Sequence, residues 1–183
     1  MHKIFLASLL AWTLLSLSPG WVLALPAPGD TLPDMVMQAP ATAEETADLG
    51  IVEGQSFRLA DLGKPLVLFE VIGVYCPQCY LQAPGFISIQ KRLAKSGLDE
   101  KVAVMALAAG GTPMETAYLH EQGNYKMPIV PDPDYSVHKL LGEPQTPFTM
   151  VLTKDGEVLF AHLGIIEDMD AFFLALQNLA KNH

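Results

Sequence analysis

The chain has 183 residues, half of them hydrophobic, with 20 acidic and 11 basic side chains and a net charge of −9. This length and composition fit one domain with a full apolar core. The acidic balance argues against nucleic acid and anionic membrane surfaces as partners, because both are bound through clustered positive charge.

Residues 1–24 have the pattern of a secretory signal peptide. His2 and Lys3 precede the apolar run Ile4–Leu17, and small or β-branched residues at −3 and −1 favour cleavage after Ala24. The apolar run is shorter than the roughly 20 residues that span a bilayer, which argues against the alternative of an N-terminal membrane anchor. We expect residues 25–183 to form an exported domain, periplasmic or otherwise outside the cytoplasm, with no stable membrane insertion.

After this segment the chain alternates between predicted strands and helices. Phe57 and Leu59 alternate with polar neighbours, which is typical of a β segment. Continuous apolar runs, typical of strands buried on both faces, are followed by a pair of shorter strands around an Asp-Gly turn. The predicted strands cover 66–72, 101–108, 149–152 and 158–163. Helical periodicity covers the segment from the cysteines to residue 97, then 112–122, 134–141 and 169–180. The order βαβα, a break, then ββα predicts an α/β fold with a mixed sheet.

The two cysteines of the chain, Cys76 and Cys79, lie between the first buried strand and the following helix. A purely structural disulfide that closes so short a loop would stabilise the fold by about 2 kcal/mol, which a domain of this size does not need. Structural zinc usually requires four ligands and often two such pairs. Copper is a better candidate than zinc for a metal site here, because two thiolates and an imidazole from His120, His138 or His162 suit it.

The position of Cys76 at a helix start favours redox chemistry. The helix dipole and unpaired N–H groups stabilise a thiolate there and lower its pKa below the ordinary value of about 8.5. Pro77 suits the first turn, because it lacks an N–H that would have no partner and its φ is already helical. We expect Cys76 to be the exposed, attacking thiol. Cys79, one turn further and more buried, would resolve the mixed disulfide.

Three features in order resemble the thioredoxin superfamily: Cys76-Pro77-Gln78-Cys79 after a buried strand, Pro84 five residues beyond it, and Thr146-Pro147 before the final ββα unit. The chain resembles most closely the exported TlpA/ResA-like thiol-disulfide oxidoreductases of the redoxin and AhpC-TSA-like group. The resemblance covers residues 29–181. It implies a thioredoxin-like three-layer fold with a mixed central sheet, an N-terminal β extension and a central insert over 111–141.

The resemblance also implies roles around the cysteines. Pro147 would be cis and face Cys76, and the Thr146 backbone would pair with an incoming peptide as a strand does. Pro84 would kink the active-site helix without a chemical role. Tyr75 stands where these proteins usually carry Trp, and we expect it to cover the substrate side of the site as an apolar lid.

Glu70 interrupts the first buried strand six residues before Cys76, where thioredoxins carry a buried acid. Burial raises the pKa of a lone carboxyl, so Glu70 would exchange a proton with Cys79 as a general acid and base. TlpA/ResA-like proteins more often carry an amide here and a glutamate at the position of Gln82. The alternative is that the Glu70 side chain points to a solvent-exposed edge of the sheet.

By resemblance, the activity is disulfide exchange with protein thiols and disulfides, with no metal and no cofactor besides the Cys76–Cys79 disulfide. The family favours reduction, as in cytochrome c maturation, with electrons from a membrane-bound redox partner. One alternative is Sco-like copper delivery by Cys76, Cys79 and His162, although those proteins normally separate the cysteines by three residues. A peroxidase is disfavoured, because Gly73 occupies the position that would need a hydroxyl.

Overall fold

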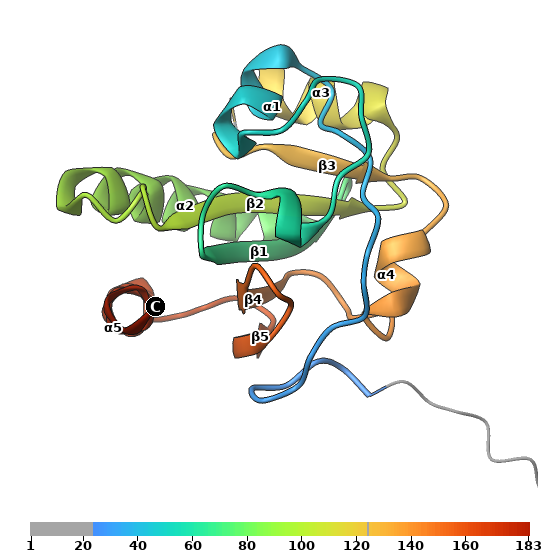
Figure 1. Ribbon diagram of the computed structural model, residues 1–183. Coiled ribbons are helices and arrows are strands. Elements are labelled where there is room, and N and C mark those ends of the chain that lie inside the picture. The colour runs from blue at the N-terminus through green and yellow to red at the C-terminus, as the bar shows by residue number, and fades with distance from the viewer. Residues whose placement is uncertain (1–23, 124) are drawn as a thin grey trace, which may run out of the picture.

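The computed structural model describes residues 24–123 and 125–183, so the predicted signal peptide lies outside the described residues except for Ala24. Five strands form one sheet in the order β3-β2-β1-β4-β5 (Figure 1). The strands are β1 (Leu66–Gly73), β2 (Val102–Ala109), β3 (Ile129–Asp132), β4 (Phe148–Thr153) and β5 (Val158–Leu163). β1, β2 and β3 run parallel, whereas β4 is antiparallel to both β1 and β5. The predicted mixed sheet is therefore confirmed.

Helices cover both faces of this sheet and complete three layers. They are α1 (Ala43–Leu49), α2 (Pro77–Ser96), α3 (Pro113–Glu121), α4 (Ser136–Leu140) and α5 (Met169–Asn182), with a 3-10 helix η1 (Leu59–Asp61). α2 and α5 pack on one face, whereas η1, α4 and the segment before β1 pack on the other (Figure 1). α1 and α3 lie toward the β3 edge, where the buried carboxylate of Glu45 accepts a hydrogen bond from the Ile129 N–H at 2.9 Å.

β1 lies at the centre of the sheet, and this position explains why its sequence is apolar. Successive side chains of a strand point to opposite faces. Leu66, Leu68 and Ile72 enter the interior beneath α2 and α5, while Phe69 enters the opposite interior. All these side chains are fully buried. The strand is therefore apolar throughout because both of its faces are covered, and Glu70 is the exception.

Two sequence expectations need correction. The N-terminal segment forms no regular β extension, because its pairing consists of the isolated bridges Thr31–Glu157 and Met37–Phe57. The residues after Phe57 turn into η1, where the Asp61 carboxylate accepts a hydrogen bond from the Arg58 N–H at 2.8 Å.

β3 was not predicted, because it has four residues and includes Pro131. Proline is tolerated there because β3 is an edge strand.

α2 begins and ends where the sequence predicts. Cys76 is its N-cap, Pro77 occupies the first turn, and Gly97 ends the helix with a left-handed φ of 69°. Pro84 lies inside the helix and lacks the N–H that would bond to the carbonyl of Tyr80. The helix therefore carries the two cysteines on its first turn, at the carboxyl end of β1.

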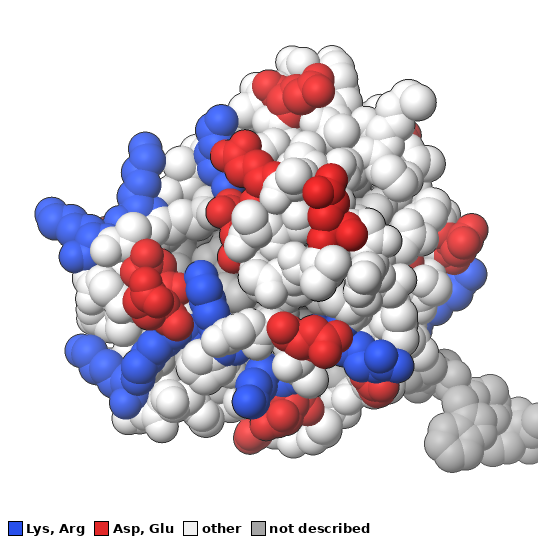
Figure 2. Space-filling model, turned by 45° about the horizontal axis from the view of Figure 1, so that its top comes forward, with Lys and Arg blue, Asp and Glu red and all other residues white. Residues whose placement is uncertain are grey.

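The described residues contain no helix long and apolar enough to cross a membrane. Basic side chains gather over the C-terminal half of α2, which includes Lys91, Arg92 and Lys95 (Figure 2). Arg92 is partly neutralised by an ion pair with Asp170 at 2.6 Å. This basic end of the helix is opposite the end that carries the cysteines.

Candidate functional site

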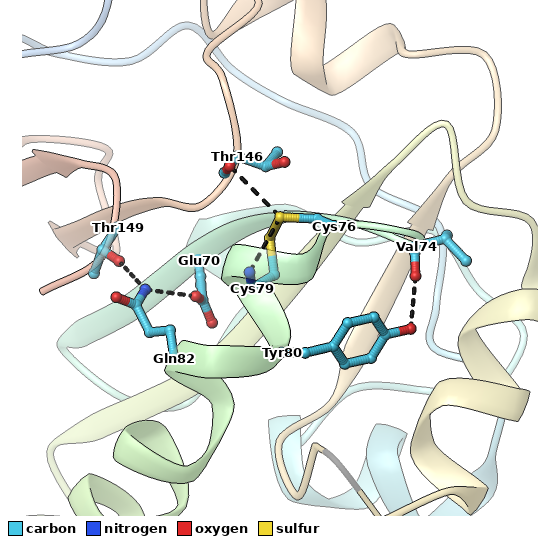
Figure 3. The surroundings of a disulfide bond; sticks show 8 residues. All are labelled: Glu70, Val74, Cys76, Cys79, Tyr80, Gln82, Thr146 and Thr149. Carbon is cyan, nitrogen blue, oxygen red and sulfur yellow. Dashed lines mark hydrogen bonds between the residues drawn. A yellow bond between two sulfur atoms is a disulfide. The ribbon is translucent and has the colours of Figure 1, made fainter.

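Cys76 and Cys79 form a disulfide at the start of α2 (Figure 3). Cys76 is partly exposed, whereas Cys79 is fully buried. The Cys79 N–H donates to the Cys76 sulfur at 3.1 Å. In the reduced protein this N–H and the helix dipole would stabilise a thiolate on Cys76. The predicted difference in accessibility between the two cysteines is confirmed.

The loop before β4 lies against Cys76. The Thr146–Pro147 peptide bond is cis, as the resemblance implies, and the Thr146 carbonyl oxygen lies 3.5 Å from the Cys76 sulfur. A Cβ on Gly73 would come within 3.3 Å of the Thr146 hydroxyl, so glycine lets the end of β1 approach this loop. The Pro147 carbonyl accepts a hydrogen bond from the Gly164 N–H at 2.8 Å. The structure thus places the Thr146 backbone beside the accessible sulfur.

Glu70 is fully buried, so the alternative that its side chain points to a solvent-exposed edge of the sheet is wrong. Its side chain points toward α2, where Gln82 Nε2 donates to Glu70 Oε1 at 2.8 Å. Glu70 Oε2 has no hydrogen-bond partner among the described residues. Burial raises the pKa of Glu70 to about 8, and the Gln82 hydrogen bond opposes part of that rise. The carboxyl is therefore mostly protonated near neutral pH.

Gln82 connects Glu70 to Thr149 and Ile166, two residues that the sequence did not indicate as part of the site. Its Nε2 lies 3.3 Å from the Thr149 hydroxyl on β4, and its Oε1 accepts a hydrogen bond from the Ile166 N–H at 2.7 Å (Figure 3). Both Gln82 and Thr149 are buried. Thr149 pairs directly with Glu70 across the antiparallel strands β1 and β4. Once that register is known, a polar residue opposite a buried acid is the signal for this contact.

Tyr125 is a second group that the sequence did not indicate. It is 2% exposed and lies in the segment before β3, a strand that was not predicted. Burial raises its pKa, and the negative charge of Glu70 adds to the effect. The Tyr80 ring lies 6.3 Å from the Tyr125 ring, and the Tyr80 hydroxyl donates to the Val74 carbonyl at 2.8 Å. Aromatic groups therefore line the interior beside the first turns of α2.

Tyr75 does not form the expected lid. Its side chain is 81% exposed, and its hydroxyl donates to the Glu115 carboxylate at 3.0 Å. The same carboxylate accepts a hydrogen bond from the Thr112 N–H at 2.9 Å at the start of α3. The ring is held outward by this contact with the central insert. It stands next to Cys76 in the chain but covers little apolar surface.

Two of the three histidines considered as copper ligands, His138 and His162, contact backbone carbonyls. His162 Nε2 lies 3.1 Å from the Ile165 carbonyl, and His138 Nε2 lies 2.9 Å from the Pro144 carbonyl. Within residues 24–123 and 125–183, no group of three His, Cys, Asp or Glu side chains is placed to hold a metal ion. The structure therefore does not assemble Cys76, Cys79 and His162 into a metal site.

A family model described as Redoxin matches residues 27–171. The chain belongs to the Redoxin family. It is 25% identical over 126 residues to the thiol-disulfide oxidoreductase ResA of Halalkalibacterium halodurans, which covers 68% of this chain and 69% of that relative.

Two solved structures share the fold of this Redoxin-family chain. A protein assigned as the thiol:disulfide interchange protein DsbE of Chlorobium tepidum has a TM-score of 0.66 and 18% identity, covering 86% of this chain and 99% of the other. A secreted disulfide oxidoreductase of Mycobacterium tuberculosis has a TM-score of 0.58 and 14% identity, covering 79% and 95%. These likenesses establish the thioredoxin-like architecture.

Proposed function

We propose that this Redoxin-family chain is a thiol-disulfide oxidoreductase that exchanges disulfides with protein substrates. The observation that carries the proposal is the Cys76–Cys79 disulfide at the start of α2, with an accessible first sulfur and a buried second one. The relative from Halalkalibacterium halodurans carries the same activity in its name. The chemistry needs no further cofactor, because the two sulfurs themselves carry the two electrons.

The reaction proceeds through a mixed disulfide. The Cys76 thiolate attacks one sulfur of a substrate disulfide, forms a bond to it and releases the other substrate sulfur as a thiolate. Cys79 then loses its proton and attacks the Cys76 sulfur. The Cys76–Cys79 bond forms, and the second substrate sulfur leaves as a thiolate. The substrate gains two electrons and the protein returns to the disulfide form seen here.

Glu70 handles the proton of Cys79 in this scheme. In the disulfide form, with a pKa of about 8, it is protonated in about nine molecules of ten at pH 7. When a reductant opens the disulfide at Cys76, Cys79 leaves as a thiolate and takes a proton from Glu70. When Cys79 later attacks the mixed disulfide, the Glu70 carboxylate takes the proton back. One carboxyl thus acts as an acid in one half-reaction and as a base in the other.

Substrate binding is assigned to the surface beside Cys76. The backbone of Thr146 and Pro147 would pair with an extended segment of the substrate that carries its cysteine. The exposed ring of Tyr75 would contact the same segment from the other side. Pro77 and Pro84 have structural roles in α2.

We further propose that the protein works outside the cytoplasm as a reductant, in a reaction of the cytochrome c maturation type, with electrons from a membrane-bound redox partner. The N-terminal sequence pattern and the secreted structural neighbour support export. The reduction potential tests the direction. A value near about −270 mV would support a reductant, whereas one near about −120 mV would mark a strong oxidant.

The exchange activity is tested with insulin as substrate and dithiothreitol as electron source. The wild-type protein should accelerate insulin reduction, and Cys76→Ser should abolish the acceleration. Cys79→Ser should trap the mixed disulfide, which a non-reducing gel detects. Activity that survives in Cys76→Ser would contradict the proposal. One equivalent of Cu(I) bound by the reduced protein and lost in His162→Ala would support copper delivery instead.

A further inference from the structure

We propose that Gln82 is a positioning residue that holds the Glu70 carboxyl by Oε1 and leaves Oε2 as the atom that carries and exchanges the proton. This inference rests on the proposed function, in which Glu70 serves Cys79. It assigns to an uncharged side chain on α2 the task of orienting the acid. The assignment follows from the hydrogen bonds of one buried amide.

The orientation of the Gln82 amide is fixed by its surroundings. The Ile166 N–H is a donor and lies 2.7 Å from one end of the amide, so that end must be the oxygen. The nitrogen end therefore faces Glu70 Oε1 at 2.8 Å and the Thr149 hydroxyl at 3.3 Å. Both amide hydrogens and the amide oxygen have partners. A flipped amide would place its own N–H groups against the Ile166 N–H and lose that hydrogen bond.

This orientation decides which oxygen of Glu70 takes the proton. Oε1 already accepts a hydrogen bond from Gln82, so a proton on Oε1 would face another donor. Oε2 has no partner among the described residues and is free to bind the proton. Cys79 lies three residues before Gln82 on α2, and both side chains are buried on the face that contacts β1. The free oxygen thus belongs to the carboxyl beneath the second cysteine.

The other titratable groups around Glu70 come from three elements. Cys79 of α2 lies beside Glu70 in Figure 3, and the charge of Glu70 acts on Tyr125 in the segment before β3. On β5, His162 pairs with Thr149, which in turn pairs with Glu70, and its ring contacts the Ile165 carbonyl. None of these donates to Glu70 in the described structure, whereas Gln82 does. The amide is therefore the group that orients the carboxyl.

An amide suits this position better than either close substitute. Methionine has a similar length but neither the donor for Glu70 nor the acceptor for Ile166. Glutamate would keep the acceptor but place a second carboxyl within hydrogen-bond distance of Glu70, and two such carboxylates cannot both ionise easily. Glutamine alone among these is neutral and offers a donor and an acceptor at once.

The first test titrates Glu70 in the oxidised protein by carbon-13 NMR of labelled glutamate carboxyls, with Glu70→Gln to identify the signal. Gln82→Met should raise the Glu70 midpoint by about one pH unit, because a hydrogen bond to the carboxylate is lost. Gln90→Met is the matched control, since Gln90 lies on the same helix but donates to the Lys126 carbonyl. An unchanged midpoint in Gln82→Met, or an equal rise in Gln90→Met, would overturn the proposal.

A second measurement needs no variant at Gln82 and stands even if Gln82→Met does not fold. In the wild-type oxidised protein, the side-chain amide signal of Gln82 should move with pH at the same midpoint as the Glu70 carboxyl. The amide signal of Gln90 should not. If the Gln82 signal ignores the Glu70 titration, the amide does not hold the carboxyl and the inference is wrong.

Exchange kinetics link the positioning to the reaction. The pH profile of insulin reduction should move upward in Gln82→Met by the shift of the Glu70 midpoint, and the same substitution should move nothing in a Glu70→Gln background. A shift that persists in that background would overturn the positioning role. A wild-type protein without exchange activity, whose Gln82 and Glu70 signals still titrate together, would overturn the proposed function and support the hydrogen-bond assignment.

Discussion

The two faces of β1 meet two different interiors. On one face Val67, Phe69 and Val71 enter a core that is apolar along the whole strand. On the other, Glu70 interrupts the apolar series at the level of α2, where Gln82 contacts it. Burying a carboxyl costs several kcal/mol of stability if it is ionised, whereas burying a phenyl ring stabilises the fold. The comparison shows one face built for stability and the other built around a titratable group.

The largest expected effect lies on the apolar face. Phe69→Ala should reduce the free energy of unfolding by about 3–5 kcal/mol, because it removes a fully buried ring and leaves a cavity. Urea unfolding at pH 5 and at pH 8 measures this loss. The loss should be the same at both pH values, since no group near it changes charge. A loss that depends on pH would break the distinction between the faces.

The polar face of β1 should make the free energy of unfolding depend on pH. The pKa of Glu70 is about 8 in the folded protein, above its ordinary value of 4.5, so folding favours its protonated form. Its contribution to stability is fully present below pH 4.5 and is lost as the pH rises through 8. Between pH 5 and pH 8 the wild-type protein should lose about 3.5 kcal/mol relative to Glu70→Gln, which stays neutral.

Urea unfolding of both proteins across this range, in the oxidised state, measures the difference. Their stabilities should be closest at low pH and diverge as the pH rises. Parallel curves would show that Glu70 titrates normally and that the two faces of β1 do not differ in this way.

The catalytic effect of the polar face should be slightly smaller. Glu70→Gln should slow the resolution of the mixed disulfide by about 100-fold, or about 2.7 kcal/mol, because Cys79 loses its proton acceptor. Attack by Cys76 should be nearly unchanged, since that sulfur depends on the helix start and the Cys79 N–H. Stopped-flow mixing of the reduced protein with a disulfide substrate separates the two steps. Equal rates of resolution in the two proteins would contradict the role of Glu70.

Most of the apolar architecture could be predicted from the sequence. The run from Leu66 to Ile72 predicted a strand covered on both faces, and the cysteines with Pro77 predicted the helix start. These features depend on local patterns of hydrophobicity and capping. β3 escaped prediction because a short edge strand with Pro131 has no such pattern. The β extension implied by the resemblance is reduced to isolated bridges, and the β segment expected at Phe57 and Leu59 gives way to a turn that the Asp61 carboxylate caps.

The polar side of the site was less predictable for the same reason. Glu70 was recognised because an acid stands out in an apolar run, and its burial is confirmed. Its partner Gln82 comes from the helix, and the further partners of Gln82, Thr149 and Ile166, come from the final ββα unit. Such contacts depend on strand register and on the position of α2 over the sheet. Neither the strand register nor the position of α2 can be predicted from the local sequence.

The smallest effect is expected outside both interiors, at Tyr75. Tyr75→Phe removes the exposed hydrogen bond to Glu115 and should leave the free energy of unfolding nearly unchanged, because water replaces the lost contact. The hydrogen bond raises the pKa of Tyr75 and helps lower that of Glu115, so it is lost when the tyrosine ionises at alkaline pH. If the ring contacts substrate, Tyr75→Ala should raise KM for insulin while Tyr75→Phe leaves it unchanged. A larger loss of stability in Tyr75→Phe would show that the central insert depends on this contact and that the site has a third structural support beside the two faces of β1.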